Sequence, residues 1–315
     1  MDAIGGYFGL ELKQGDHYHK DALCLNSARN CFEYVLRVRN YKKVYIPYYT
    51  CEVILEPLER LNIEYEFYHI NELLEPKSEY SLKQNEAFLY TNYFGLKQDC
   101  VKRLAKLYKK QLIVDNAQAF YAKPLDGIDT FYSPRKFFGV ADGGYLYINQ
   151  KLDIELEQDY SYERMSHLLK RIDVSAEFGY NDFKRNDDSL INQPIKLMSN
   201  LTNKILSSID YNSVKSKRIE NYLYLDSKLK DKNLFQLTLN NNDVPMVYPY
   251  LTNDIALKQK LIANKIFVAT YWPNVKDWTK EEDLEYQLTN NLLPFPIDQR
   301  NNYVQFFKFN ILWKK

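Results

Sequence analysis

Residues 112–120 read LIVDNAQAF, and residues 129–147 read DTFYSPRKFFGVADGGYLY. Each stretch begins with a short apolar or aromatic run that predicts a β-strand. The first strand ends at Asp115, and the second is followed by Ser133 and Lys136. Because ligands of open α/β sheets bind beyond the carboxyl ends of the strands, we expect these polar side chains to face one cleft.

Further strands and helices alternate along the first half of the chain. The β-branched and aromatic runs predict strands over residues 42–50, 65–70, 86–94, 111–117, 129–133 and 144–149. Apolar residues at helical spacing predict helices over residues 27–39 and 99–110. Strands that alternate with helices imply crossover connections, and so an α/β fold with a mostly parallel sheet.

The second half has a different texture. Residues 151–212 are polar and predicted to be irregular, with a predicted loop over residues 177–189, and residues 213–230 predict a helix. The later segments predict a strand over 244–251, a helix over 254–265 with Asp254 as its N-cap, and a strand over 265–273. We therefore expect a large domain over residues 1–212, including an N-terminal arm, and a small α+β domain over residues 213–315.

Composition excludes several classes of protein. The chain has 315 residues, with 42 Lys+Arg against 41 Asp+Glu, and this balance argues against binding nucleic acid through its phosphates. No run approaches the roughly 18 apolar residues of a membrane-spanning helix. The N-terminal residues MDAIGGYFGLEL lack the basic region of a secretory signal. We expect a cytoplasmic protein that binds neither membranes nor nucleic acid.

Cysteine and histidine residues indicate no metal site. The four cysteines form no CxxC pair and are expected to be reduced thiols: Cys24, Cys31, Cys51 and Cys100. His17 and His19 have no third ligand at a recognisable spacing, so we expect both at the surface.

The polar residues after the two strands suit pyridoxal 5'-phosphate (PLP). A lysine forms a Schiff base with the PLP aldehyde, and a carboxylate pairs with the pyridinium nitrogen. Lys136 and Asp115 have the residue types for these tasks, although either alone is equally typical of a solvated lysine or a turn residue. Ser27 is a good N-cap for a helix whose N-terminus could bind phosphate, and Arg29 could add a charge. The alternative for this segment is an ordinary capped helix.

Taken in order, several short motifs resemble one family. These are NS at 26–27, IPYYT at 46–50, DNAQA at 115–119, SPRK at 133–136 and DGG at 142–144. Further matches are YTNYFGLKQD at 90–99, KRIENYLYL at 217–225 and LLPFPIDQR at 292–300. The set resembles the DegT/StrS family of PLP-dependent sugar aminotransferases over nearly the whole chain. The resemblance implies fold type I, the architecture of aspartate aminotransferase, with a mostly parallel central sheet, flanking helices and a smaller C-terminal α+β domain.

The resemblance also implies roles for individual residues. Lys136 lies where the family has its Schiff-base lysine, and Asp115 matches the residue that pairs with the pyridinium nitrogen. These two are the expected catalytic residues. Gln118 matches the residue near the phenolic oxygen of the cofactor, and Ser133 matches a phosphate ligand.

The remaining expected contacts involve the phosphate. The backbone amides of Ala28 and Arg29 match the phosphate-binding start of a helix. In the family an Asn from the partner subunit reaches the phosphate, and Asn181 is our candidate for it. The implied protein is a homodimer with shared active sites. It would transfer an amino group from glutamate to a keto group of a nucleotide-linked deoxysugar, as in polysaccharide biosynthesis.

Some residues depart from the family pattern. Ala28 and Arg29 replace Gly-Thr, Asp142 replaces a Glu, and Cys51 stands where an aromatic ring usually stacks on the cofactor. Tyr49 or Tyr93 could supply that ring. These departures keep two alternatives open: a catalytically degenerate member of the fold that acts as a binding or regulatory protein, and a PLP enzyme with a non-sugar acceptor.

Overall fold

A central sheet of seven strands organises the computed structural model, which describes residues 4–302. The strand order is β1-β7-β6-β5-β4-β2-β3. In that order the bounds are Leu23–Leu25, Gly144–Tyr147, Asp129–Tyr132, Leu112–Asp115, Glu86–Thr91, Lys43–Pro47 and Glu64–Tyr68. Neighbours from β3 to β6 pair in parallel, and β7 is antiparallel to both β6 and β1. The prediction of a mostly parallel α/β sheet is confirmed.

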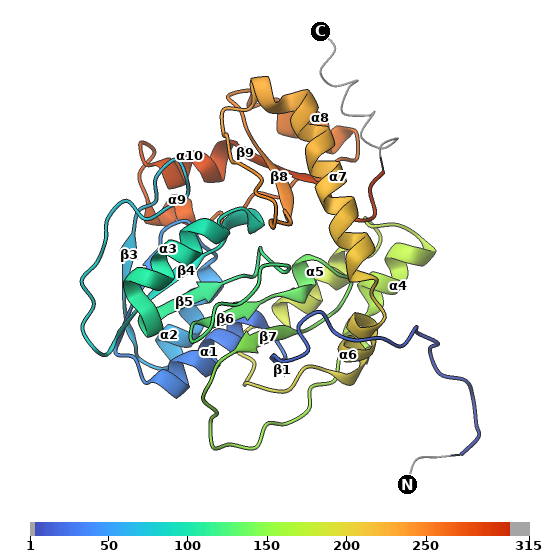
Figure 1. Ribbon diagram of the computed structural model, residues 1–315. Helices are drawn as coiled ribbons and strands as arrows, with labels where there is room; N and C mark the ends of the chain where they lie inside the picture. The colour runs from blue at the N-terminus through green and yellow to red at the C-terminus, as the bar shows by residue number, and fades with distance from the viewer. Residues whose placement is uncertain (1–3, 303–315) are drawn as a thin grey trace.

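Helices cover both faces of the sheet (Figure 1). The helices up to the end of this region are α1 (Ala28–Arg39), α2 (Leu55–Arg60), α3 (Gln98–Tyr108), α4 (Ser166–Asp173), α5 (Tyr180–Asp188), α6 (Asn200–Ser207) and α7 (Tyr211–Leu229). Three later helices lie beside a second sheet instead: α8 (Leu257–Ala263), α9 (Val275–Trp278) and α10 (Leu284–Asn291). In β4, Phe88 and Tyr90 point into one apolar cluster, and Leu89 points into the other. This alternation is what a strand buried on both faces requires.

Helix α1 is set by its caps and by one ion pair. The Ser27 side chain accepts a hydrogen bond from the Asn30 amide, and Asn40 ends the helix in a left-handed conformation with φ of 52°. In the last turn, Arg39 makes two hydrogen bonds of 2.7 Å to the carboxylate of Asp129 at the start of β6. The N-terminus of α1 therefore lies at the end of the sheet where β5 and β6 finish.

A second, smaller sheet follows. Strands β8 (Val247–Leu251) and β9 (Leu292–Pro296) pair antiparallel. Figure 1 shows the long helix α7 running from this pair toward α6 and the central sheet. We call the segment from α7 to β9 the small unit. The domain division at residue 212 stays a prediction, and residues 303–315 lie outside the described part of the chain.

Several local predictions were wrong. The region over 151–212 that was predicted to be irregular contains helices α4, α5 and α6. The predicted loop over 177–189 holds α5, where Asp182 pairs with both Lys170 and Arg185. The predicted strand over 265–273 is irregular: it pairs with no strand among the described residues, and Lys265 and Trp272 near its ends have φ of 57° and 56°, outside the strand range. Helix α8 starts at Leu257, so Asp254 is not its N-cap.

His19 was also predicted wrongly. The side chain is 2% exposed and packs against the rings of Phe120 and Tyr132. Its Nε2 lies 2.7 Å from the Phe120 carbonyl oxygen, which satisfies the buried imidazole. Burial lowers the pKa of His19 to about 4.

No helix in residues 4–302 is long and apolar enough to cross a membrane.

Candidate functional site

Asp115 lies at the carboxyl end of β5, at the edge of the sheet where ligands of such folds bind. Its Oδ1 accepts a hydrogen bond of 2.7 Å from the Ala117 amide. Burial raises the pKa of Asp115, while the positive charge of Lys136 and the Ala117 N–H group act in the opposite direction. A half-buried carboxylate near a cation is suited to hold a protonated ring nitrogen.

Lys136 ends a 3₁₀ turn, η4 (Pro134–Lys136), that follows β6. Its side chain is exposed, and within residues 4–302 it makes no hydrogen bond or ion pair. The positive charge of Lys136 acts to lower the pKa values of both Asp115 and Cys51, so its amine lies within electrostatic reach of both side chains. An amine without a partner beside a carboxylate is available to react with an aldehyde.

Gln118 has a buried side-chain amide whose oxygen is hydrogen-bonded and whose nitrogen is not. The side chain is 1% exposed, and its Oε1 accepts a hydrogen bond of 3.0 Å from the Phe94 amide. Its Nε2 is buried and has no partner within the described residues. Since buried amides normally use both ends, this nitrogen is ready to donate to a ligand oxygen.

The double glycine holds the start of α1 against the sheet. The Gly143 amide donates a hydrogen bond of 2.7 Å to the Asn26 carbonyl, and Gly143 has φ of 118°. A Cβ on Gly144 would lie 2.5 Å from the Ser27 carbonyl oxygen. The backbone amides of Ala28 and Arg29, in the first turn of α1, therefore lie beside β7. Amides in the first turn of a helix have no partner within the helix, so they can bind an anion.

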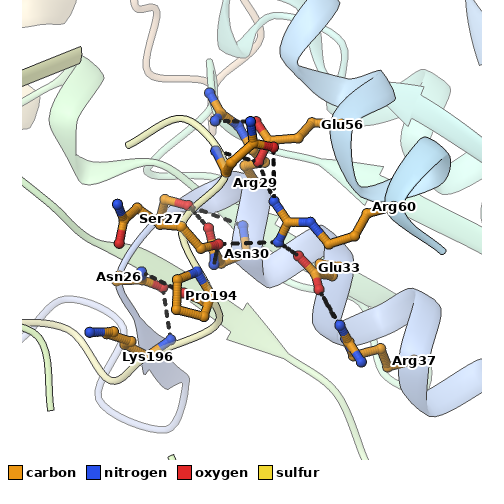
Figure 2. A network of polar contacts seen from close by, with 12 residues as sticks. Asn26, Ser27, Arg29, Asn30, Glu33, Arg37, Glu56, Arg60, Pro194 and Lys196 are labelled. Atoms are coloured by element: carbon orange, nitrogen blue, oxygen red, sulfur yellow. Dashed lines mark hydrogen bonds and ion pairs between the residues drawn. The ribbon is translucent and has the colours of Figure 1, made fainter. Parts of the chain in front are cut away.

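The side chain of Arg29 is committed elsewhere. Figure 2 shows it within a network of charged side chains at the start of α1, where its Nη1 donates to Glu56. The same nitrogen donates to the Leu190 carbonyl oxygen at 2.9 Å. Arg60 joins Glu56 to Glu33 in this network. Any contribution of Arg29 to phosphate binding thus comes mainly from its backbone amide.

Ser133 immediately precedes the η4 turn and is largely buried. The neighbouring Pro134 ring lies 3.1 Å from where a Gly143 Cβ would be. Gly143 therefore lies between the Ser133 turn and the start of α1 and contacts both. Because the two segments are so close, one anion could bind between Ser133 and the α1 amides.

Asp142 is a structural residue that the sequence did not assign. It is fully buried and accepts hydrogen bonds from the Ser199 amide at 2.8 Å, the Ser199 hydroxyl at 2.7 Å and the Thr202 hydroxyl. These contacts tie the segment after Lys136 to the start of α6. Ser199 caps α6 three residues before Thr202, a pattern visible in the sequence but placed there in an irregular region.

Asn181 makes no contact with Asp115, Lys136, Gln118 or Ser133 within the described part of the chain. It lies near the start of α5 with an exposed side chain. The far end of α5 does reach the lysine segment, through an Asp187–Arg135 ion pair of 2.6 Å and an Asn186 hydrogen bond of 2.9 Å to the Ala141 carbonyl oxygen.

Tyr49 and Tyr93 form one buried aromatic group with Trp272 of the small unit. The ring centres of Tyr49 and Trp272 are 4.6 Å apart, and the Tyr93 hydroxyl donates to the Tyr49 carbonyl oxygen at 3.0 Å. The Tyr49 hydroxyl is buried without a partner among the described residues. Cys51 is half-buried; burial raises the pKa of its thiol, while the Val53 amide and the charges of Lys136 and Arg29 act in the opposite direction.

These residues fit PLP. The buried Gln118 nitrogen lacks an acceptor, which a phenolic oxygen would supply. The Asp115 carboxylate can receive a ring N–H, Lys136 offers an amine, and the α1 amides offer an anion site. Among residues 4–302 no group of three His, Cys, Asp or Glu side chains could hold a metal ion.

Comparison with solved structures identifies the fold. The chain is similar to Spr1654 of Streptococcus pneumoniae, described as a sugar aminotransferase, with 16% identity, 93% of this chain and 85% of that chain covered, and a TM-score of 0.66. It is similar to the sugar aminotransferase CalS13 of Micromonospora echinospora, with 12% identity, 93% and 86% covered, and a TM-score of 0.63. A DegT DnrJ EryC1 StrS aminotransferase from Brucella abortus gives 13% identity, 92% and 84% covered, and a TM-score of 0.59.

The predicted PLP-transferase fold is therefore confirmed, at identities that establish the fold alone. No family model matches the chain, and no curated protein matches its sequence.

Proposed function

We propose that this protein is a PLP-dependent sugar aminotransferase. The observations that support the proposal are the electrostatic effect of Lys136 on Asp115 and the unpartnered amide nitrogen of Gln118, on a fold shared with sugar aminotransferases. Spr1654 has been solved in PLP and PMP forms, which supports the choice of cofactor.

Each residue has a distinct task in this proposal. PLP supplies an electron sink that stabilises negative charge at the Cα atom of an amino donor. Asp115 keeps the ring nitrogen protonated, and Gln118 donates a hydrogen bond to the phenolic oxygen. The amine of Lys136 would hold the cofactor and, when free, could move a proton at the Cα atom of the donor. Ser133 and the amides of Ala28 and Arg29 bind the phosphate.

The likeness to sugar aminotransferases supports a keto-sugar as the acceptor. We further propose glutamate as the amino donor and a nucleotide-linked deoxysugar as the acceptor, and these two choices rest on the resemblance of the sequence motifs to the DegT/StrS family. A role in polysaccharide biosynthesis in the cytoplasm accords with these substrates.

Exposed apolar side chains on α4, on α5 and in the segment between them support a homodimer. These side chains, all more than 40% exposed, are Leu169, Ile172, Val174, Phe178, Tyr180 and Phe183. Surfaces of this kind commonly mark protein interfaces. Asn181 lies on the same helix, so a second copy docked here could deliver it to the partner's phosphate.

The primary test is a half-reaction. Purified protein mixed with PLP should develop the absorbance band of a lysine-bound cofactor, borohydride should trap the adduct on Lys136, and glutamate should convert the bound PLP to the pyridoxamine form. The Lys136→Ala variant should show neither the absorbance band nor the borohydride adduct. The matched control Lys123→Ala, which removes another exposed lysine, should show both. If the wild-type protein shows neither the absorbance band nor the borohydride adduct, the enzyme proposal fails. That result would favour the alternative, a binding or regulatory protein.

The acceptor and the shared site need separate tests. Pyridoxamine-loaded protein should return to the PLP form with nucleotide-linked keto-sugars and not with simple 2-oxo acids other than 2-oxoglutarate; the reverse preference would favour a non-sugar acceptor. If active sites are shared, mixing Lys136→Ala with Asn181→Ala subunits should restore part of the activity that both lack alone.

A further inference from the structure

Arg218 is a buried cation that forms no ion pair among residues 4–302, although the carboxylate of Asp298 lies close enough for its charge to raise the pKa of Arg218. It lies on α7 with 1% of its surface exposed. Its Nη1 donates a hydrogen bond of 2.9 Å to the Met246 carbonyl oxygen, and its Nε is buried without a partner in that part of the chain. Burial lowers the pKa of Arg218 to about 10, so it remains charged at neutral pH. Unpaired buried arginines are rare, so its contacts are informative.

One contact of Arg218 is with the residue that follows Lys136. The guanidinium carbon lies 4.5 Å from the ring centre of Phe137, a geometry in which cation and ring attract each other. The Phe137 amide donates to the Pro134 carbonyl oxygen at 2.9 Å, so Phe137 belongs to the same turn as Lys136. Holding the Phe137 ring therefore holds the lysine turn.

A second contact grips Phe137 through its backbone. Gln299 Nε2 donates to the Phe137 carbonyl oxygen at 3.0 Å. The loop that carries Gln299 is fixed by Asn221, whose Nδ2 donates to the Ile297 carbonyl oxygen at 3.0 Å. Asn221 lies three residues after Arg218, on the same buried face of α7. Helix α7 thus holds Phe137 by its ring and, through the loop, by its carbonyl group.

A chain of hydrogen bonds leads from Arg218 to the other side of the candidate site. Arg218 donates to the Met246 carbonyl oxygen, and the Met246 amide donates to the Phe94 carbonyl oxygen at 2.8 Å. The Phe94 amide in turn donates to Gln118 Oε1 at 3.0 Å. The Gln118 side chain is therefore oriented by a backbone segment that the small unit holds.

We propose that Arg218 is a positioning residue, which fixes the Lys136 turn and Gln118 relative to each other and so lets the small unit set the geometry of the site. This inference rests on the proposed function of Lys136 and Gln118. Arg218 acts through Phe137 on one side and through Met246 and Phe94 on the other. A rotation of α7 would move both sides together.

Hydrogen exchange of the protein without added cofactor tests this directly. Arg218→Met keeps an apolar chain without the guanidinium, and Arg218→Lys keeps the charge without the flat donor group. In both variants, peptides over residues 133–138 and 92–96 should exchange about tenfold faster, because their anchors are lost. Peptides from α1 should be unchanged, and Lys228→Met, which alters an exposed cation on the same helix, should match wild type throughout.

Two further measurements report on Lys136 itself. Its rate of acylation by acetic anhydride, followed by mass spectrometry across pH, should change several-fold in Arg218→Met. With PLP added, the pH midpoint of the lysine-bound absorbance band should shift upward in Arg218→Met and stay near the wild-type value in Arg218→Lys, since only the first removes a positive charge.

The outcomes separate the possibilities. Folded Arg218 variants with wild-type exchange and acylation would overturn the proposal, and so would faster exchange spread evenly over the chain, which indicates a purely structural role. If Arg218→Met does not fold, Gln299→Leu tests the same turn from its other contact and should give the same local increase over 133–138. If wild-type protein takes up no PLP, the proposed function fails, while exchange and acylation still decide the role of Arg218.

Discussion

Gly144 lies so close to Ser27 that a Cβ atom on it would stand 2.5 Å from both the carbonyl carbon and the carbonyl oxygen of Ser27. The same Cβ would lie 2.7 Å from the Cys31 sulfur. Strand β7 and the start of α1 are thus in backbone contact. The α1 amides can meet the η4 turn only because residue 144 has no side chain.

We expect Gly144→Ala to displace the start of α1. Overpacking of this kind costs about 1–3 kcal/mol in the free energy of unfolding, measured by denaturant titration. Affinity for PLP should fall as well, because the phosphate-binding amides move. Gly139→Ala is the control: its Cβ would make an ordinary contact of 3.4 Å with Leu168, so both quantities should stay near wild type. Equal stability of the two variants would contradict the close approach.

Gln118 offers a test of the unused amide nitrogen. Gln118→Leu leaves the Phe94 amide buried without its acceptor, which should lower the free energy of unfolding by about 1–3 kcal/mol. PLP should raise the melting temperature of the wild type more than that of Gln118→Leu, because the variant offers no donor to the cofactor.

The control is Gln287→Leu, which changes an exposed glutamine on α10. It should leave both the melting temperature and its PLP-induced rise unchanged. If PLP stabilises Gln118→Leu as much as wild type, the Gln118 side chain does not contact the cofactor.

The parts of the molecule that the sequence predicted are those defined by neighbours in the chain. Strands β5 and β6 are visible in the sequence as apolar runs that end in polar residues. Ser27 predicts the start of α1, because its side chain accepts a hydrogen bond from the amide three residues later. Asp115 and Lys136 were expected from such local patterns and Gln118 from the family resemblance, and all three follow the carboxyl ends of β5 and β6 at one edge of the sheet. Their roles toward PLP stay predictions.

The parts that could not be predicted depend on contacts between distant residues. Strand β1 has three residues and exists because it pairs with β7, about 120 positions away. Asp142 gains its role from Ser199, and Phe137 gains its anchor from Arg218. No periodicity records such pairings, since packing between segments overrides local preference.

His19 should contribute to acid sensitivity. Burial lowers its pKa from 6.5 to about 4, so between these values the unfolded chain binds a proton more readily than the folded protein. The stabilisation from neutral His19 is complete above pH 6.5 and is lost as the pH falls toward 4, amounting to roughly 3 kcal/mol in the free energy of unfolding. In His19→Gln that free energy should vary less steeply across this range.

A direct titration provides the check on His19. Its imidazole C–H resonances, followed by NMR, should report a midpoint well below 6. A midpoint near 6.5 would mean that the ring is solvated and that the contact with the Phe120 carbonyl oxygen is not maintained.

Arg39 and Asp129 form the best-defined ion pair between α1 and the sheet. Two hydrogen bonds of 2.7 Å join them, and the side chains of Arg39 and Asp129 are 18% and 2% exposed. Arg39→Ala leaves a buried carboxylate without its cation, so we expect a loss of about 2–4 kcal/mol in the free energy of unfolding, measured by urea titration. The matched control is Lys43→Ala, whose partner Glu66 is 49% exposed, and its loss should stay below about 1 kcal/mol. Adding Asp129→Ala to Arg39→Ala should recover part of the lost free energy of unfolding, because the unpaired charge is removed. If the two single losses in free energy of unfolding simply add in the double variant, the two residues do not interact.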